Sequence, residues 1–203
     1  MSCPFCQNHG IAKPPDLSHL PLQRISPDAL LRKIAESGLG AVAYTYNEPA
    51  LQAEYIIEAA PLLKDRKVAT VLVSNGMFSG VSLQDLAPWV DAANIDVKTF
   101  DPAKYQEIGG DLERVKTNIA FLADSGVHVE LTNLVVPGIS DGPDDFERLV
   151  NWIASVSADI PLHISRYFPA YRYGAPSTEI PLMKEFRKMA ESRLSCVYLG
   201  NVR

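Results

Sequence analysis

Cysteine is scarce in this chain of 203 residues, which has Cys3, Cys6 and Cys196 and no others. An odd number of cysteines is not the composition of a secreted, disulfide-stapled domain, and it favours the reducing cytoplasm. Long apolar runs are also absent and no signal peptide precedes Cys3, so neither a membrane span nor a membrane partner is expected. Positive charge is in short supply as well: 19 Lys and Arg stand against 24 Asp and Glu, which disfavours nucleic acid as a partner.

A Gly-x-Gly-x-x-Gly turn is missing after the first predicted strand, which removes support for a dinucleotide-binding fold. What is present is a repeated alternation of strand and helix patterns without a linker, which predicts one α/β domain over residues 1–203. Such alternation builds a parallel sheet, either open or closed into a barrel. Strands are predicted at residues 40–45, 68–73, 92–98, 127–136, 162–165 and 196–199. Helices are predicted near residues 27–37, 50–63, 82–89, 112–125, 143–153 and 181–193, and an extended loop at 11–25.

Cys3 and Cys6 form a Cys-x-x-Cys pair, whose sulfurs are close enough to make a disulfide, to hold zinc or to bind part of an iron–sulfur cluster. A structural zinc site needs a second Cys/His pair at short spacing, and His9 and His19 do not supply one. A dithiol redox site belongs between a strand and a long helix, whereas two prolines follow here. A cluster needs a third thiolate nearby, so the pair alone leaves the three chemistries open.

Polar side chains gather where the predicted strands end. The sets are Asn47 and Glu48, Ser74 and Asn75, Asp96 and Lys98, Asn133, and His163 with Ser165 and Arg166. In a parallel α/β barrel the carboxyl ends of the strands line one mouth, where sites are built. Each residue alone has an ordinary structural role, such as a common turn or a satisfied core histidine. The fold would nevertheless gather all of these sets on one face, which predicts a single site there.

Six segments of the chain, in this order, resemble the radical S-adenosylmethionine (SAM) enzymes. They are residues 3–8, 45–49, 73–76, 94–98, 163–166 and 197–202, and together they span the chain. The Tyr-Asn-Glu-Pro segment and the His-Ile-Ser-Arg segment are most similar to the AmmeMemoRadiSam-system radical SAM proteins, which are similar to the activating enzymes of pyruvate formate-lyase. The resemblance implies a partial (β/α)6 TIM-like barrel whose first strand is absent from this chain.

The resemblance also implies a [4Fe–4S] cluster, held by three cysteines spaced Cys-x-x-x-Cys-x-x-Cys. Cys3 and Cys6 match the second and third of these, and the first would fall upstream of Met1. We therefore expect a chain truncated at both ends, which by itself is inactive and holds no stable cluster. Cys196 is expected to be a buried core thiol rather than the third ligand.

SAM contacts are implied for a set of residues spread over the chain: Phe5, Asn47, Glu48, Ser74, Asn75, Asp96, Lys98 and His163. The Glu48 carboxylate would bind the SAM ammonium group, and Lys98 would face the SAM carboxylate. Phe5 would pack near the adenine, and His163 would lie near the ribose. Asp96 and Lys98 are two residues apart on a predicted strand, so they point to the same face.

The implied reaction is the reductive cleavage of SAM, which gives methionine and a 5′-deoxyadenosyl radical that abstracts hydrogen from an unidentified substrate. The resemblance further implies an electron donor such as flavodoxin or ferredoxin. Two alternatives stay open within the resemblance: an activating enzyme of a glycyl-radical enzyme, and a non-catalytic remnant that only binds. A zinc or dithiol redox protein is the alternative outside it.

The loop after the fifth predicted strand is unusually rich in aromatic residues for a solvated loop. We predict that Arg166, Tyr167 and Tyr171 contact the substrate, since binding loops share this composition. Arginine in particular suits a carboxylate or phosphate that is held by two hydrogen bonds. The alternative is a hydrophobic lid over the mouth of the barrel.

Overall fold

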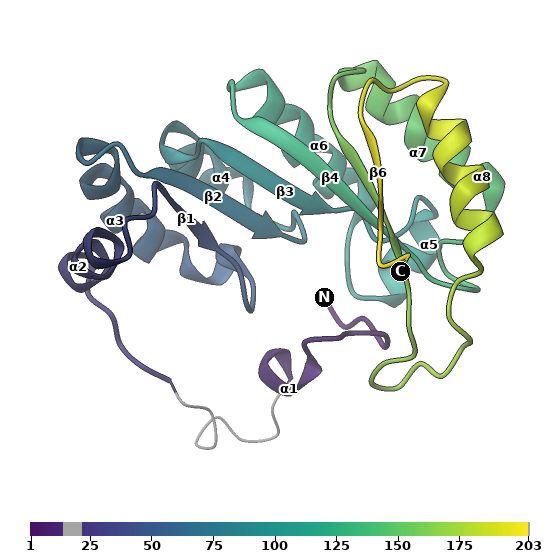
Figure 1. Cartoon of the computed structure of the whole chain (residues 1–203), viewed down its shortest axis with the longest axis horizontal. Helices are drawn as coiled ribbons and strands as arrows, with labels where there is room; N and C mark the ends of the chain where they lie inside the picture. Colours follow the sequence, from purple (N-terminus) through teal and green to yellow (C-terminus); the bar gives the residue numbers. More distant parts are fainter. Residues whose placement is uncertain (14–21, 203) are drawn as a thin grey trace.

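The computed structural model describes residues 1–13 and 22–202 and contains one parallel six-stranded sheet in the order β1-β2-β3-β4-β5-β6 (Figure 1). The strands are β1 (Ala41–Tyr44), β2 (Ala69–Ser74), β3 (Ala92–Asp96), β4 (His128–Val135), β5 (Leu162–Arg166) and β6 (Val197–Gly200). Among the described residues, β1 and β6 each pair with one neighbour, so the sheet is open. The predicted α/β class and all six predicted strands are confirmed.

Helices lie on one face of this sheet and leave its other face open (Figure 1). They are α2 (Pro27–Ser37), α3 (Ala53–Asp65), α4 (Gly80–Leu86), α6 (Leu112–Asp124), α7 (Pro143–Val156) and α8 (Ile180–Glu191), with short 3-10 turns η2 (Pro49–Gln52) and η3 (Ala87–Trp89). Local signals set their ends: the Ser26 side chain accepts the Ala29 N–H at the start of α2, and Gly38 ends it at φ +67°. Among these helices, none is both long enough and apolar enough to pass through a membrane.

The strands alternate between a buried face and an open face with a period of two residues. Leu72, Ile95 and Leu131 point toward the helices and are completely buried in the main core. Their neighbours Asn94 and Thr132 point to the open face, where Thr132 Oγ1 donates to Asn94 Oδ1 at 2.8 Å. The open face therefore carries polar groups that the helices do not cover, and this face holds the candidate site.

Two of the helices in the described part of the chain were not predicted. The first, α1 (His9–Ala12), overlaps the start of the predicted loop at 11–25, whose residues 14–21 fall outside the described part of the chain. The second, α5 (Pro102–Glu107), begins at an Asp101 cap that accepts the N–H groups of Ala103 and Lys104. An acidic cap followed by proline is a readable helix start, so α5 could have been found from the sequence.

The amino-terminal segment lies at the carboxyl ends of the strands (Figure 1). The Ser2 N–H donates to the Ile108 carbonyl at 2.6 Å, which ties this segment to the end of α5. Cys3 and Phe5 are buried in a second, smaller core. This core also contains Ile108, Val136 and Tyr167. The two neighbouring cysteines are thus held by the folded domain rather than by a free chain end.

Candidate functional site

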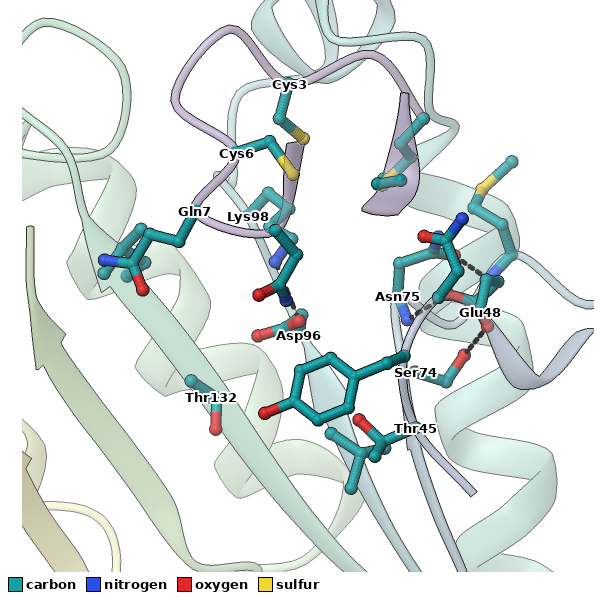
Figure 2. Close-up of a pocket in the computed structure, with 18 of the residues that line it drawn as sticks. Cys3, Cys6, Gln7, Thr45, Glu48, Ser74, Asn75, Asp96, Lys98 and Thr132 are labelled. Carbon is teal, nitrogen blue, oxygen red and sulfur yellow. Dashed lines mark hydrogen bonds and ion pairs between the residues drawn. The ribbon is translucent and has the colours of Figure 1, made fainter. Parts of the chain in front are cut away.

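The ends of strands β1 to β5 surround a cavity of about 580 Å³. Its lining includes every residue predicted to bind the cluster or SAM except His163, namely Cys3, Phe5, Cys6, Asn47, Glu48, Ser74, Asn75, Asp96 and Lys98. Figure 2 shows the two cysteines approaching from the cysteine loop on one side, and Glu48, Ser74, Asn75, Asp96 and Lys98 approaching from the strand ends on the other. The structure therefore brings together polar sets that are far apart in the sequence.

The two cysteines point their sulfur atoms into this cavity, above Lys98 and Asp96 (Figure 2). Both thiols are free, with Cys3 buried and Cys6 half-buried. Burial raises the pKa of the Cys3 thiol, and the positive charge of Lys98 opposes this shift. A cation beside the thiols would favour their thiolate forms, which are the forms that bind metals.

Iron–sulfur clusters take thiolate ligands, and a cavity of this kind offers room beside Cys3 and Cys6. Within residues 1–13 and 22–202, no group of three or more Cys, His, Asp or Glu side chains is arranged to hold a metal ion. The residues present thus fit two corners of a cluster. Cys196 directly precedes β6, at the end of the sheet opposite the cavity, so it lies away from the cysteine pair. It is half-buried, however, so the expectation of a buried core thiol was wrong.

Asp96 and Lys98 form the one ion pair that lines the cavity among the described residues. Lys98 Nζ lies 2.8 Å from Asp96 Oδ2. Burial lowers the pKa of Lys98, but the charge of Asp96 and its hydrogen bond outweigh this and hold that pKa above its ordinary value. Lys98 therefore remains a cation in the cavity, with donors that a bound carboxylate could share.

Glu48 joins the ends of two neighbouring strands through its carboxylate. The Ser74 hydroxyl donates to Oε1 at 2.5 Å, and the Asn75 N–H donates to Oε2 at 3.0 Å. The Ala50 N–H also donates to Oε1, so Glu48 caps the η2 turn. Two oxygens with about four acceptor positions leave room for one further donor, such as an ammonium group.

The loop that follows β5 packs away from the cavity, against the cysteine loop and its own strand. Tyr167 is completely buried, and its hydroxyl donates to the Tyr173 carbonyl at 2.5 Å. Arg166 Nε donates to the Thr178 carbonyl at 2.7 Å. Neither of these residues, nor Tyr171, lines the cavity. The structure therefore does not bring the three predicted substrate residues to the site.

His163 lies on the open face of β5, two residues before Ser165, which lines the cavity. Its Nε2 is 2.7 Å from Glu130 Oε2, and its ring stacks on Tyr198 with 5.1 Å between centroids. His128 Nε2 lies 3.1 Å from the other oxygen of Glu130. Burial alone would raise the pKa of Glu130, but the hydrogen bonds from the two histidines hold it below its ordinary value.

Several residues of the cavity were not predicted from the sequence. Thr132 and Lys13 line the cavity but were not singled out. Asn133 was grouped with the site, yet it points to the helical side, where its Nδ2 donates to the buried Val97 carbonyl at 2.8 Å. The alternation along β4 places Thr132, not its neighbour, on the open face. Strict alternation of side chains along that strand would have placed Thr132 on the open face from the sequence alone.

Comparison with known proteins fits this arrangement. Residues 1–153 match the radical SAM superfamily. An uncharacterised protein of Methanocaldococcus jannaschii is 30% identical over 98% of this chain and 60% of its own length. The pyruvate formate-lyase-activating enzyme of Clostridium pasteurianum is 24% identical over 77% of this chain and 66% of its own length. The chain thus spans roughly two thirds or less of these relatives.

The fold is shared with solved structures as well. A domain of the pyruvate-formate lyase-activating enzyme from Bacteroides vulgatus superposes with a TM-score of 0.69, over 80% of this chain and 99% of that chain, at 13% identity. At such low identity the likeness concerns the fold alone. The family match, however, covers most of the sequence and includes the cysteine pair and four of the six strands. This chain belongs to the radical SAM superfamily.

Proposed function

We propose that this chain forms the SAM-binding core of an enzyme that cleaves SAM reductively at a [4Fe–4S] cluster. The observation that carries the proposal is the convergence of two free thiols, the Glu48 carboxylate and the Asp96–Lys98 ion pair on one cavity. SAM presents an ammonium group and a carboxylate on the same carbon. A cavity that offers both signs of charge beside a pair of thiols suits that ligand.

Each group has a separate task in this proposal. Cys3 and Cys6 would hold two irons of the cluster, which supplies the electron for cleavage when it is bound. Glu48 would accept a hydrogen bond from the SAM ammonium group, and Lys98 would donate to its carboxylate. Phe5, which is buried and lines the cavity, would pack near the adenine and restrict the access of water there. The protein therefore binds, orients and shields SAM, while the cofactor carries the chemistry.

Anaerobic reconstitution with iron and sulfide tests this function. We would compare the 203-residue chain with a version extended upstream through a further cysteine, and measure iron content and the dithionite-driven formation of 5′-deoxyadenosine. The extended version is expected to load near four irons and to cleave SAM, and the shorter chain to hold only a labile cluster. SAM binding without cleavage by the extended, fully loaded protein would instead support the non-catalytic alternative.

A second candidate is the activation of a glycyl-radical enzyme, which is favoured by the name of another relative, a putative glycyl-radical enzyme activating enzyme of Methanocaldococcus jannaschii that is 26% identical. In that case the hydrogen would come from a glycine of a partner protein. Electron paramagnetic resonance of a mixture of the loaded enzyme and candidate partner would then show a glycyl radical. Formation of 5′-deoxyadenosine with small molecules, and no protein radical, would argue for a different substrate.

A further inference from the structure

Basic side chains surround the ring of Tyr171 at the surface of the loop that carries the two cysteines. The His9 imidazole stacks on this ring with 4.8 Å between centroids. Lys13 Nζ lies 5.3 Å from the same centroid, and the guanidinium carbon of Arg172 lies 5.0 Å from it. We call His9, Lys13, Tyr171 and Arg172 the basic patch.

Two side chains of the basic patch form hydrogen bonds to the backbone of the cysteine pair. Lys13 Nζ donates to the Cys3 carbonyl at 3.3 Å. His9 Nδ1 lies 3.2 Å from the Cys6 carbonyl, and because a carbonyl only accepts, this nitrogen must carry the hydrogen. Each cysteine therefore has a patch side chain one hydrogen bond away from its backbone.

The Tyr171 ring is held at the surface by its backbone. Its φ of +57° lies in the left-handed region, which residues with a side chain rarely adopt. The next N–H, that of Arg172, donates to the Pro4 carbonyl at 3.0 Å and fixes the turn against the cysteine loop. The residue is 37% exposed. An unusual backbone conformation that presents an aromatic ring outward is typical of a functional surface.

The charge of the basic patch is a local exception. The chain as a whole has a net charge of −5, whereas Lys13 and Arg172 bring two positive charges together in this patch, which attracts acidic proteins locally. Exposed tyrosine and arginine side chains are also the residue types enriched in protein interfaces. The patch therefore fits an acidic protein, and its position selects one that must come close to Cys3 and Cys6.

We propose that the basic patch docks an acidic one-electron carrier protein. This inference rests on the proposed function, because reductive SAM cleavage consumes one electron and the cluster site lies directly behind the patch. The docked carrier would lose one electron, and the cluster held at the cysteine pair would gain it. Docking at the carbonyls of the cysteine loop would shorten the path of that electron.

Reduced flavodoxin, an acidic carrier, is the probe for this docking surface. Arg172→Glu reverses one patch charge and keeps the backbone N–H that bonds to Pro4. The matched control is Lys184→Glu, on the exposed side of the outer helix α8. Flavodoxin affinity would be measured by titration of the cluster-free protein at low and at high salt. In parallel, the same substitutions would be made in the extended, cluster-loaded protein, and its rate of 5′-deoxyadenosine formation with flavodoxin would be divided by its rate with dithionite.

The expected result is an affinity about tenfold weaker for Arg172→Glu at low salt, since rim charges govern the encounter of partners. That difference should shrink at high salt, because ions screen exposed charges. The flavodoxin-to-dithionite ratio should fall in step, and Lys184→Glu should match the unmodified protein. Equal affinity of both variants, or no flavodoxin binding at all, would overturn the docking surface.

Two further outcomes are informative. The first distinguishes a surface that docks the electron carrier from one that docks the substrate, and the second separates failure of the docking proposal from failure of the proposed function. If Arg172→Glu weakens the binding of a substrate protein but not of flavodoxin, the patch recognises substrate and the carrier assignment is wrong. If dithionite drives no SAM cleavage in the extended protein, the proposed function fails, and the titration with cluster-free protein still decides whether the patch binds flavodoxin.

Discussion

Replacing Glu48 by methionine tests the role of this residue in joining two strand ends. Methionine has a similar length but accepts no strong hydrogen bond, so the Ser74 hydroxyl and the N–H groups of Ala50 and Asn75 lose their acceptor. Each hydrogen bond to a charged group contributes about 1.5–3 kcal/mol. The Glu48 side chain is half-buried next to the cavity, so water can accept hydrogen bonds from some of these donors and reduces the loss of free energy. We expect the free energy of unfolding to fall by about 3 kcal/mol.

The assay is thermal unfolding followed by circular dichroism. For a domain of this size a loss of about 1 kcal/mol lowers Tm by about 2–4 °C, so Glu48→Met should lower Tm by about 6–12 °C. Glu48→Gln keeps one oxygen acceptor and should show about half of that effect. Glu58→Met, on the exposed surface of α3, is the matched control and should stay within about 0.5 kcal/mol. A Tm for Glu48→Met equal to that of the control would refute the reasoning.

The result bears on the proposed function, because Glu48 is expected to serve both the fold and the ligand. From the sequence it was assigned to the SAM ammonium group, whereas the structure shows its carboxylate already bonded to three protein donors. A loss of SAM binding in Glu48→Met would therefore follow from either role. Stability has to be measured beside affinity in every variant of this residue.

Three further predictions concern groups with distinct partners. Lys98→Ala should weaken SAM binding at least about tenfold in an equilibrium assay and change Tm by less than about 2 °C, since the Asp96 side chain that loses its partner is 32% exposed at the cavity and can be hydrated; a large loss of Tm with normal affinity would contradict this. The lowered pKa of Glu130 means that its contribution to stability is present above the ordinary carboxyl range and is lost as the pH falls through the folded-state value. Acid unfolding of Glu130→Gln should accordingly lack that part of the pH dependence. An unchanged profile would show that the hydrogen bonds from the two histidines to Glu130 do not stabilise the fold. Asn118→Ala removes the bonds to the Gly76 and Phe78 carbonyls and should cost about 2–3 kcal/mol in urea unfolding, so a cost under about 0.5 kcal/mol would show that water replaces them.

The sheet and the ends of its strands could be predicted because they depend on local patterns. Short apolar runs, each followed by polar turn residues, indicated the six strands and the sets that now line the cavity. The turn at Asn75-Gly76 shows why such signals are reliable. Gly76 has φ +75°, and a side chain at this position would come within 2.9 Å of Ile95. Few other sequences fit that turn.

The errors lie where the outcome depends on register or on distant segments. Asn133 and Thr132 are neighbours, and a one-residue error in the pleat exchanges the face on which each lies. His163 was placed at the strand end, but β5 continues to Arg166, so the imidazole lies deeper and bonds to Glu130. The surroundings of Tyr171 involve residues from the opposite end of the chain, and no local pattern encodes them.

The hydrogen bond from the Arg172 N–H to the Pro4 carbonyl determines when the cysteine loop can fold during synthesis of the protein. The cysteine loop leaves the ribosome well before its partner loop, which follows β5. Contacts between such distant segments form late in folding. The cysteine loop should therefore remain unsettled on the nascent chain and acquire its final shape only after synthesis of β5. Iron and sulfide would then be delivered to a completed domain rather than to a chain that is still growing.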